Sequence, residues 1–580
     1  MNQYIVPWTE RSYPMRSDIM KNGTERTLSR LLMQAGGLTK EQVSKPLIGV
    51  IGSYTNLFTG HAMLDRISGW VQEGILMAGG TPAVSNTIAL CDGMAENTPG
   101  MRYPLPSRDI ICNSVEAFVE GHSLDGLVCI ANCDKIVPGM LMAIMRLNIP
   151  AIFISGGPSA PPENGYDNGK AFADLMSAAA LGVDAITNEM QNNTCGPCPG
   201  CNCGMGTAVS MQFLSEVMGL APMGNGTVPT YYNDRTYMAK WVGQRIVEMV
   251  YEDLKPRDIV TRETFKNALR VDMMMGCSTN TALHLPAIAA EAGYSLTLED
   301  FRRASRSTPQ IVKLYPSNNP HSVEDFRRAG ALAAVIRQGI DAGYINGSTG
   351  TIYGKTLDEM TRDAKVKNTN VIHPFDNPYY KEGGLAVLRG NLAPDGCVIK
   401  TGGVVPEMLE HTGRAVCYDS EIAFYDEVVA GKSRLKPGDC VVIRYEGPVA
   451  GPGMREMLTA THMVRSLGLS STVSLITDGR FSGGSVGGVI GHVSPEACKG
   501  GLIGLIEDGD IIEYSIPKGT IELKVDEATI AERRAKWVCP PPKFKTGLLA
   551  QYAALAAPAP LGARMIGDMS SLDDLVPVDF

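Results

Sequence analysis

Residues 124–157 read LDGLVCIANCDKIVPGMLMAIMRLNIPAIFISGG, and this stretch decides the fold. Two apolar runs, at 124–133 and 150–157, stop at polar or glycine-rich turns, and a helical segment opened by Pro138 lies between them. Buried strands that alternate with helices predict a parallel sheet covered on both faces. Ligands bind such sheets beyond the carboxyl ends of the strands, where the sequence Asn-Cys-Asp-Lys at 132–135 falls.

The same alternation begins earlier, because a strand is expected at 46–54 and a helix at 64–80. Residues 205–345 are mostly helical by their apolar spacing. After about residue 375 the chain becomes a series of short β-rich runs separated by Gly, Pro and Asp, which is typical of a barrel or sandwich. We therefore expect an α/β protein with two domains. An N-terminal domain, 1–375, has a parallel sheet flanked by helices, and 376–580 form a C-terminal β-barrel-like domain.

Length and charge exclude several classes of protein. A chain of 580 residues is too long for one hydrophobic core, so two or more domains are expected. The net charge of -9 and the lack of a Lys/Arg-rich run argue against nucleic-acid binding. No apolar stretch approaches the roughly 20 residues that span a bilayer, and the N-terminus has no apolar signal region. A cytoplasmic protein without membrane contact is the expectation.

The 14 cysteines favour metal or redox chemistry over a disulfide framework in a chain of this kind. Most stand singly in apolar or helical surroundings, which predicts ordinary core packing. These single cysteines include Cys112, Cys129, Cys417, Cys440 and Cys498.

Four cysteines gather in one short segment, at Cys195, Cys198, Cys201 and Cys203. The interleaved Gly and Pro leave the backbone free to turn several thiolates toward one point, as soft metals require. An iron–sulfur cluster, a structural zinc site and a redox dithiol all remain open, although zinc usually takes two separated ligand pairs and no second CxxC exists elsewhere. Cys133, in the loop at 132–135, could add a ligand from a distance.

Oxygen donors are found at Asp92, Asp134 and Glu456. Hard carboxylates are the ligands that Mg²⁺ takes together with water and substrate oxygens, although each of these alone is more often a solvated or capping residue. Ser482 follows an expected strand at 472–479 in the sequence DGRFSGG. Since no P-loop pattern is present, this segment is either a tight turn or a means of presenting the serine to a substrate.

Taken together, these motifs resemble the family of dihydroxy-acid dehydratases and sugar-acid (phosphogluconate) dehydratases, over nearly the whole chain. The stretches that carry the resemblance are NTIALCDG at 86–93, PLPSRD at 104–109, ANCDKIVPGMLMA at 131–143, the CxxCxxC segment, GCSTNTALHL at 276–285, VVIRYEGPVAGPGMREML at 441–458 and LITDGRFSGGSVGGVIGHVSPEA at 475–497. The intact GPGMREML and the ending LLAQYAALAAPAPLGA at 548–563 are most similar to the dihydroxy-acid dehydratases of branched-chain amino-acid biosynthesis.

The resemblance implies a role for each matching residue. Cys133 and Cys201 would hold an iron–sulfur cluster, with Cys195 and Cys198 as further candidates. Mg²⁺ would bind Asp92, Asp134 and Glu456, together with Lys135, which the family carries as a carbamate. Ser482 would be the catalytic base, and Arg480 and Thr477 would bind substrate.

Two departures from the family pattern leave the cluster type open between [2Fe–2S] and [4Fe–4S]. Members with a [2Fe–2S] cluster take a third cysteine from the loop after the first strand, where this chain has Gly60 or its neighbours. That loop resembles the subgroup with an oxygen-labile [4Fe–4S] cluster. The family's C-x-G-M is also one residue longer here, from Cys201 to Met205, so Cys203 stays possible as the ligand.

The resemblance thus implies a hydro-lyase that dehydrates a 2,3-dihydroxy carboxylic acid to a 2-keto acid. The alternative within the family is a sugar-acid dehydratase acting on arabinonate, xylonate or gluconate. A non-catalytic zinc-bound scaffold is the alternative from another class. The expected assembly is a homodimer or a dimer of dimers.

Overall fold

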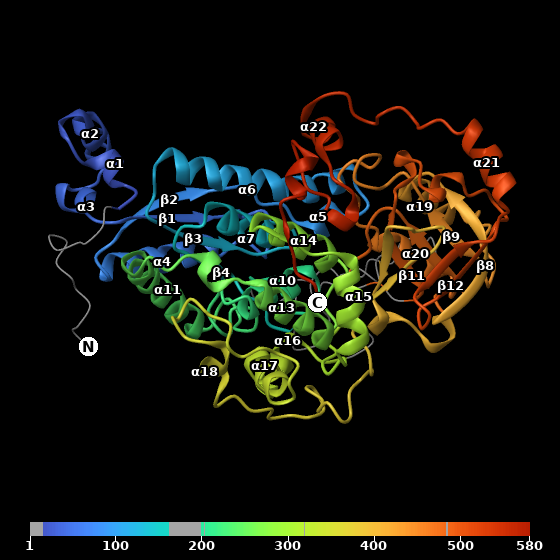
Figure 1. Cartoon of the computed structure of the whole chain (residues 1–580), viewed down its shortest axis with the longest axis horizontal. Coiled ribbons are helices and arrows are strands. Elements are labelled where there is room, and N and C mark those ends of the chain that lie inside the picture. Colours follow the sequence, from blue (N-terminus) through green and yellow to red (C-terminus); the bar gives the residue numbers. More distant parts are fainter. Residues whose placement is uncertain (1–14, 162–198, 202, 318–319, 483–484, 486) are drawn as a thin grey trace, which may run out of the picture.

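The computed structural model describes residues 15–161, 199–201, 203–317, 320–482, 485 and 487–580 (Figure 1). Its N-terminal part is built on a four-stranded parallel sheet of order β2-β1-β3-β4. The strands are β1 (Leu47–Gly52), β2 (Thr81–Asn86), β3 (Gly126–Ala131) and β4 (Ala151–Ser155). Every residue of β1, β3 and β4 is buried, which explains why these strands are continuous apolar runs.

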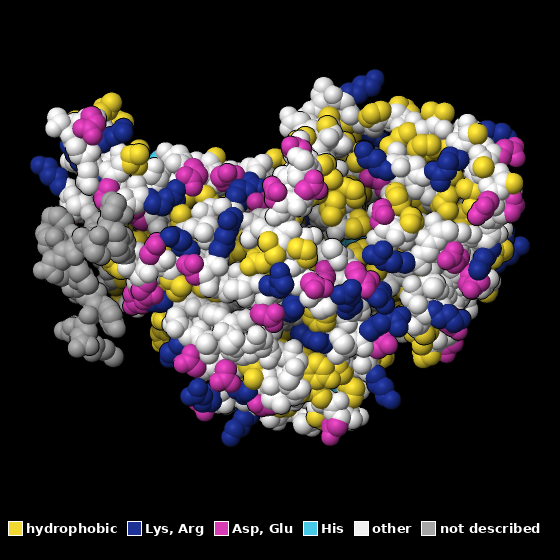
Figure 2. Space-filling view, in the orientation of Figure 1, with side chains coloured by type: hydrophobic (Ala, Val, Ile, Leu, Met, Phe, Trp, Pro, Cys, Tyr) yellow, Lys and Arg dark blue, Asp and Glu magenta, His cyan; other side chains and the backbone are white. Residues whose placement is uncertain are grey.

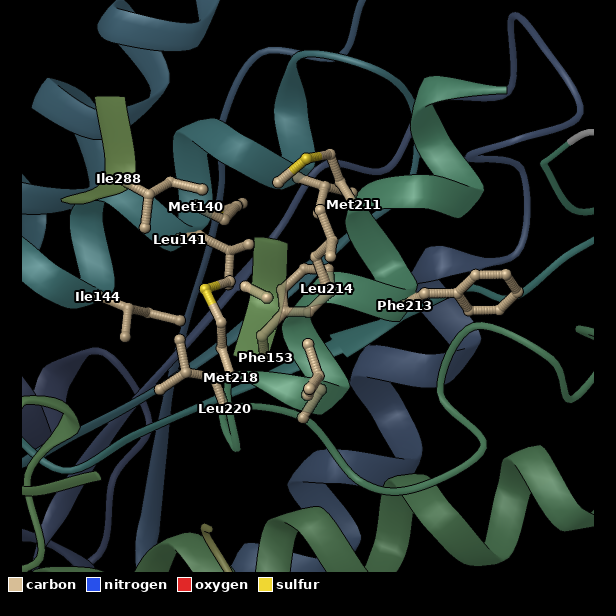
Figure 3. Packing of buried hydrophobic residues seen from close by; sticks show 14 of the residues in the cluster. Met140, Leu141, Ile144, Phe153, Met211, Phe213, Leu214, Met218, Leu220 and Ile288 are labelled. Carbon is tan, nitrogen blue, oxygen red and sulfur yellow. The ribbon is translucent and has the colours of Figure 1, made fainter. Parts of the chain in front are cut away.

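Helices cover both faces of this sheet. Helices α4 (Leu64–Met77) and α11 (Asn233–Glu252) pack together on one face, and α6 (Pro104–Gly121) and α7 (Ile136–Leu147) pack together on the other (Figure 1). Figure 3 shows side chains of α7, β4, α10 (Thr207–Val217) and α14 (Thr281–Glu291) meeting in one core. The other helices of this part are α1 (Asp18–Lys21), α2 (Thr27–Ala35), α3 (Lys40–Ser44), α5 (Asp92–Ala95), α12 (Pro256–Ile259), α13 (Arg262–Met275), α15 (Leu298–Ser307), α16 (Val323–Ala329), α17 (Ala331–Asp341) and α18 (Leu357–Thr361).

The C-terminal part is an eight-stranded sheet of order β13-β12-β8-β9-β10-β11-β7-β6. Its strands are β6 (Ala386–Leu388), β7 (Gly396–Ile399), β8 (Glu410–Tyr418), β9 (Cys440–Ile443), β10 (Ser474–Thr477), β11 (Val489–Ser494), β12 (Ile511–Ser515) and β13 (Thr520–Leu523). Arg389, just after β6, bridges Thr520 at the start of β13, so the two edges of the sheet nearly close. The predicted fold class, a helix-flanked parallel sheet plus a barrel-like domain, is confirmed.

Alternate residues of β9 belong to two different cores. Cys440 and Val442 pack inside the barrel, while Val441 and Ile443 pack with the cluster that includes Met463 of α20 (Leu458–Ser466). This period of two buries both faces of the strand. The remaining helices of this part are α19 (Glu421–Val429), α21 (Glu527–Lys536) and α22 (Gly547–Leu555). The chain then returns to the N-terminal part, where β14 (Val576–Pro577) pairs with β5 (Tyr294–Ser295).

One helix and one cysteine differ from the sequence prediction. The helical pattern at 322–340 is two helices, because Gly330 adopts φ 128° between α16 and α17, a backbone conformation that favours glycine. The prediction that Cys498 packs singly in the core was wrong, since it is half-buried and forms a disulfide with Cys539, 41 residues later. A pairing over that separation cannot be read from local pattern. Cys112, Cys129 and Cys440 are buried as predicted, and Cys417 is half-buried.

In the part of the chain that the structure describes, no helix combines the length and apolar character needed to cross a bilayer. On the face drawn in Figure 2, acidic and basic side chains are interspersed over the surface.

The contact between α4 and α11 generates a stability prediction. A Cβ added at Gly74 would collide with the carbonyl oxygen of Lys240, and one added at Gly243 with that of Val71. We expect Gly243→Ala to lower the free energy of unfolding by about 1–3 kcal/mol through overpacking. The matched control is Gly69→Ala, also on α4, where an added Cβ meets nothing within 4 Å. Thermal or denaturant unfolding should rank Gly243→Ala below wild type and leave Gly69→Ala at or above it, and equal effects would contradict the packing argument.

Candidate functional site

The two sheets direct the carboxyl ends of parallel strands to one place. Asp92 begins α5 after β2, and residues 132–135 link β3 to α7. From the barrel, Arg480 lies three residues beyond the end of β10 and pairs in a β-bridge with Glu456, which lies between β9 and α20. Loops at the carboxyl ends of parallel strands, from the N-terminal sheet and from the barrel, thus form one shared site.

Three carboxylates and a lysine form the centre of this site. One oxygen from each of Asp92, Asp134 and Glu456 lies within 4.8 Å of the others. Lys135 Nζ is 2.6 Å from Asp92 Oδ2, 3.3 Å from Glu456 Oε2 and 3.4 Å from Asp134 Oδ2. Asp92 Oδ1 is buried without a hydrogen-bond partner among the described residues. A group of hard oxygen donors with a buried spare oxygen fits Mg²⁺.

Glu456 is held rigidly from the barrel side. Arg480, fully buried, donates through Nη1 to Glu456 Oε2 at 2.6 Å and through Nε to the Met454 carbonyl oxygen at 2.6 Å. Asn280 Nδ2 donates to the same Glu456 oxygen at 3.2 Å. Although burial raises the pKa of Glu456, the charges of Lys135 and Arg480 outweigh it and hold this pKa below its ordinary value. Asn280 was not predicted, although it stands in the motif at 276–285.

Ser482 and the cavity lie beside this group. Ser482 is half-buried, hydrogen-bonds to Glu456, and lines a cavity of about 460 Å³ together with Asp92, Asp134 and Glu456. Thr477 is buried at the end of β10, where its Oγ1 accepts from Gly479 N at 2.9 Å, and it is not among the described residues that line the cavity. Substrate binding by Thr477 and by Arg480 stays a prediction.

The thiols Cys133 and Cys201 line the same cavity. Cys133 has φ 67°, a left-handed conformation that costs a non-glycine residue about 1–3 kcal/mol and often marks a functional position. Cys201 Sγ accepts from Gln212 Nε2 at 3.3 Å. Cys203 is buried but absent from the described lining, and Cys195 and Cys198 lie outside the described residues. Soft donors from separate segments at one cavity fit an iron–sulfur cluster.

Two further cavity residues were not predicted. Cys91, directly before Asp92, lines the cavity, and its thiol is hydrogen-bonded to that of Cys133. Glu96 also lines it, and its Oε2 is buried without a partner within the described part of the chain. Burial raises the pKa of Glu96 well above its ordinary value, reinforced by the negative charges of Glu456 and Glu421. Cys91 lies within the quoted motif at 86–93 and Glu96 follows it by three residues, and this motif is the only signal that could have drawn attention to them.

The chain is similar to known proteins over nearly its whole length. Residues 45–360 match the family model described as dihydroxy-acid/6-phosphogluconate dehydratase N-terminal, and residues 370–563 match its C-terminal counterpart. A protein named dihydroxy-acid dehydratase from Syntrophobacter fumaroxidans is 47% identical over 95% of this chain and 99% of its own length. A protein of the same name from Acetivibrio thermocellus is 46% identical over 95% of this chain and 99% of its own length. This chain therefore belongs to the dihydroxy-acid/6-phosphogluconate dehydratase family.

Proposed function

We propose that this protein removes water from a 2,3-dihydroxy carboxylic acid to give a 2-keto acid, in keeping with the name dihydroxy-acid dehydratase that two of its relatives carry. One observation carries the proposal: a single cavity is lined by the three-carboxylate group, the thiols Cys133 and Cys201, and the hydroxyl of Ser482. A dehydration across two adjacent carbons needs a Lewis acid for the leaving hydroxyl and a proton acceptor for the neighbouring carbon, and these donors and the serine could supply both to one small molecule.

In the proposal, Cys133 and Cys201 hold an iron–sulfur cluster, and Asp92, Asp134 and Glu456 hold Mg²⁺, with Lys135 as a fourth ligand if it is carbamylated. When bound, these groups supply Lewis acidity toward the leaving C3 hydroxyl and the substrate carboxylate. We infer the dependence on an iron–sulfur cluster from the thiol donors and the dependence on Mg²⁺ from the carboxylate donors.

Ser482 takes the C2 proton in this proposal. A serine hydroxyl is a weak base, so its deprotonated form needs stabilisation by nearby positive charge. Arg480 contacts Glu456, the residue to which Ser482 is hydrogen-bonded, and so brings a positive charge near the serine oxygen. Lys135, which also contacts Glu456, adds a second positive charge only in its unmodified form. The C3 hydroxyl departs as hydroxide. It then combines with the proton that the serine took from C2 and leaves the site as water. The resulting enol tautomerises to the 2-keto acid.

The proposal includes an enzyme of the cytosol that assembles as a homodimer or a dimer of dimers. Both statements rest on the resemblance to the family.

A second candidate substrate class is favoured by Glu96. Met94 and Leu458 offer apolar surface to the cavity, as a branched dihydroxy acid of amino-acid biosynthesis requires. The spare oxygen of the Glu96 carboxyl offers a hydrogen-bond partner instead, which suits the additional hydroxyls of a sugar acid. The two classes are separated by assaying anaerobically purified enzyme on 2,3-dihydroxyisovalerate and on arabinonate, xylonate and gluconate.

Ser482→Ala tests the proton acceptor. We expect kcat on the preferred substrate to fall by about 10²–10⁴-fold, the usual contribution of a positioned acid–base group. Iron, sulfide and Mg²⁺ content should not change. Ser466→Ala, a half-buried serine on α20 whose hydroxyl donates to the His462 carbonyl oxygen, is the matched control and should keep wild-type turnover. Unchanged turnover in Ser482→Ala would remove the serine from the mechanism.

Asp92→Asn tests the oxygen-donor group. Loss of one anionic ligand should weaken binding of Mn²⁺, used as an EPR-visible substitute for Mg²⁺, by at least about tenfold, or about 1.4 kcal/mol. The control Asp439→Asn removes a buried carboxylate that pairs with Arg414 in the barrel, away from the group. Equal Mn²⁺ affinities in wild type and Asp92→Asn would contradict the assignment.

Glu96→Leu tests the substrate class. If the carboxyl recognises a sugar-acid hydroxyl, kcat/KM on aldonates should drop by about 10-fold, since leaving a buried hydrogen-bonding group without its partner costs about 1–3 kcal/mol. Activity on 2,3-dihydroxyisovalerate, which has no further hydroxyl, should be kept or improved. A parallel loss on both substrates would show that Glu96 does not discriminate between them.

A further inference from the structure

Three thiols, not two, line the cavity within the described part of the chain: Cys91, Cys133 and Cys201. They come from three separate segments, since Cys91 follows β2, Cys133 follows β3 and Cys201 precedes α10. Cys91 and Cys133 are close enough for their thiols to hydrogen-bond. We propose that Cys91 is the third cysteine ligand of the iron–sulfur cluster in this protein. This inference rests on the proposed function.

The position of Cys91 follows from the sheet. Strands β2 and β3 both pair in parallel with β1, so the segments that leave their carboxyl ends emerge at the same edge. Cys91 immediately precedes Asp92 and occupies the extended position before α5. The segment that carries a metal-binding carboxylate therefore also delivers a thiol beside Cys133.

The loop after β1 does not compete for this role. Residues 55–61 contain no cysteine, and Gly60 lies against Cys133, since a Cβ built at Gly60 would be 3.3 Å from Cys133 Sγ. The cysteine ligands of a cluster are distributed over more than one iron, so they need not all converge on one point as the ligands of a single ion do. Cys91 is half-buried and also lines a second hollow beside Phe58, so its side chain is not packed on all sides and has space to change rotamer.

Three thiolates leave one iron position without a protein ligand. A [4Fe–4S] or [2Fe–2S] cluster held by four cysteines has none free. Cys91, Cys133 and Cys201 line the same cavity as the carboxylates and Ser482, so the cluster that they would hold could supply its Lewis acidity to a substrate bound there. Each thiol releases its proton on binding.

Iron and sulfide content and the EPR spectrum of the reduced protein test this assignment without reference to turnover. Anaerobically purified full-length wild type is compared with Cys91→Ala, Cys91→Ser, Cys133→Ser and Cys203→Ala, and with Cys417→Ala as the half-buried control thiol in the barrel. We expect Cys91→Ala to lose at least half of its bound iron and sulfide. Cys91→Ser should keep more of the cluster but with shifted EPR and visible spectra, because an oxygen ligand replaces sulfur. Cys417→Ala and Cys203→Ala should match wild type.

Several outcomes would overturn the assignment. Wild-type iron content and spectra in both Cys91 variants would remove Cys91 from the ligand set, and so would cluster loss in Cys203→Ala with Cys91→Ala unaffected. If Cys91→Ala does not fold, as judged by circular dichroism, the spectra of Cys91→Ser decide, since a merely structural residue would leave them unshifted. A wild-type protein without iron and sulfide would overturn the proposed function as well, which distinguishes that failure from failure at Cys91 alone.

Discussion

The buried contact between Lys135 and Glu456 joins two parts of the chain that are 321 residues apart. Removing charges from water costs several kcal/mol per ion, and breaking such a pair by deleting one partner costs about 3–5 kcal/mol. Both charges are therefore paired only when the N-terminal sheet and the barrel are correctly positioned relative to one another. Nearby polar contacts reinforce the same interface, since Arg102 pairs with Glu446 and Arg455 donates to the Thr98 carbonyl oxygen.

Charge balance at this contact explains why it suits a cation. Three carboxylates, Asp92, Asp134 and Glu456, surround the cations Lys135 and Arg480, so one negative charge is left in excess in a mostly buried group. An unpaired buried charge is unfavourable unless it is neutralised or coordinates a metal. With Lys135 unmodified, a divalent cation bound to these oxygens would relieve the excess and would leave positive charge to hold an anionic substrate.

Much of this could be predicted from the sequence, for physical reasons that differ between elements. Strands β1, β3 and β4 are apolar because both faces are covered, and the resulting runs are visible in the chain. Strand β2 was not predicted, since it lies at the sheet edge, carries Pro82 and is only partly buried. Strand β8 was missed as well, because its alternation of exposed and buried residues contains His, Thr, Gly and Arg.

The candidate site divides in the same way. Asp92, Asp134, Glu456 and Ser482 were selected by residue type within motifs, and the structure brings them to one cavity. Asn280, Cys91 and Glu96 were missed because their importance lies in what they contact: Asn280 holds Glu456, Cys91 touches Cys133, and Glu96 has an oxygen without a partner. Contacts between segments 43 to 200 or more residues apart, such as Lys135 with Asp92 or Arg480 with Asn280, depend on tertiary structure that no local pattern records.

The distribution of donors between the two parts suggests how the site is completed. The thiols that line the cavity, within the described residues, all belong to the N-terminal part, whereas Ser482 and Arg480 belong to the barrel. Only the oxygen-donor group takes ligands from both, because Asp92 and Asp134 come from one part and Glu456 from the other. A cluster could therefore be held by the N-terminal part alone, while the proton acceptor reaches the substrate only once the barrel has docked. The three carboxylates contact one another only when the barrel is packed against the N-terminal part. A cation bound to them would therefore stabilise the arrangement in which the serine reaches the substrate.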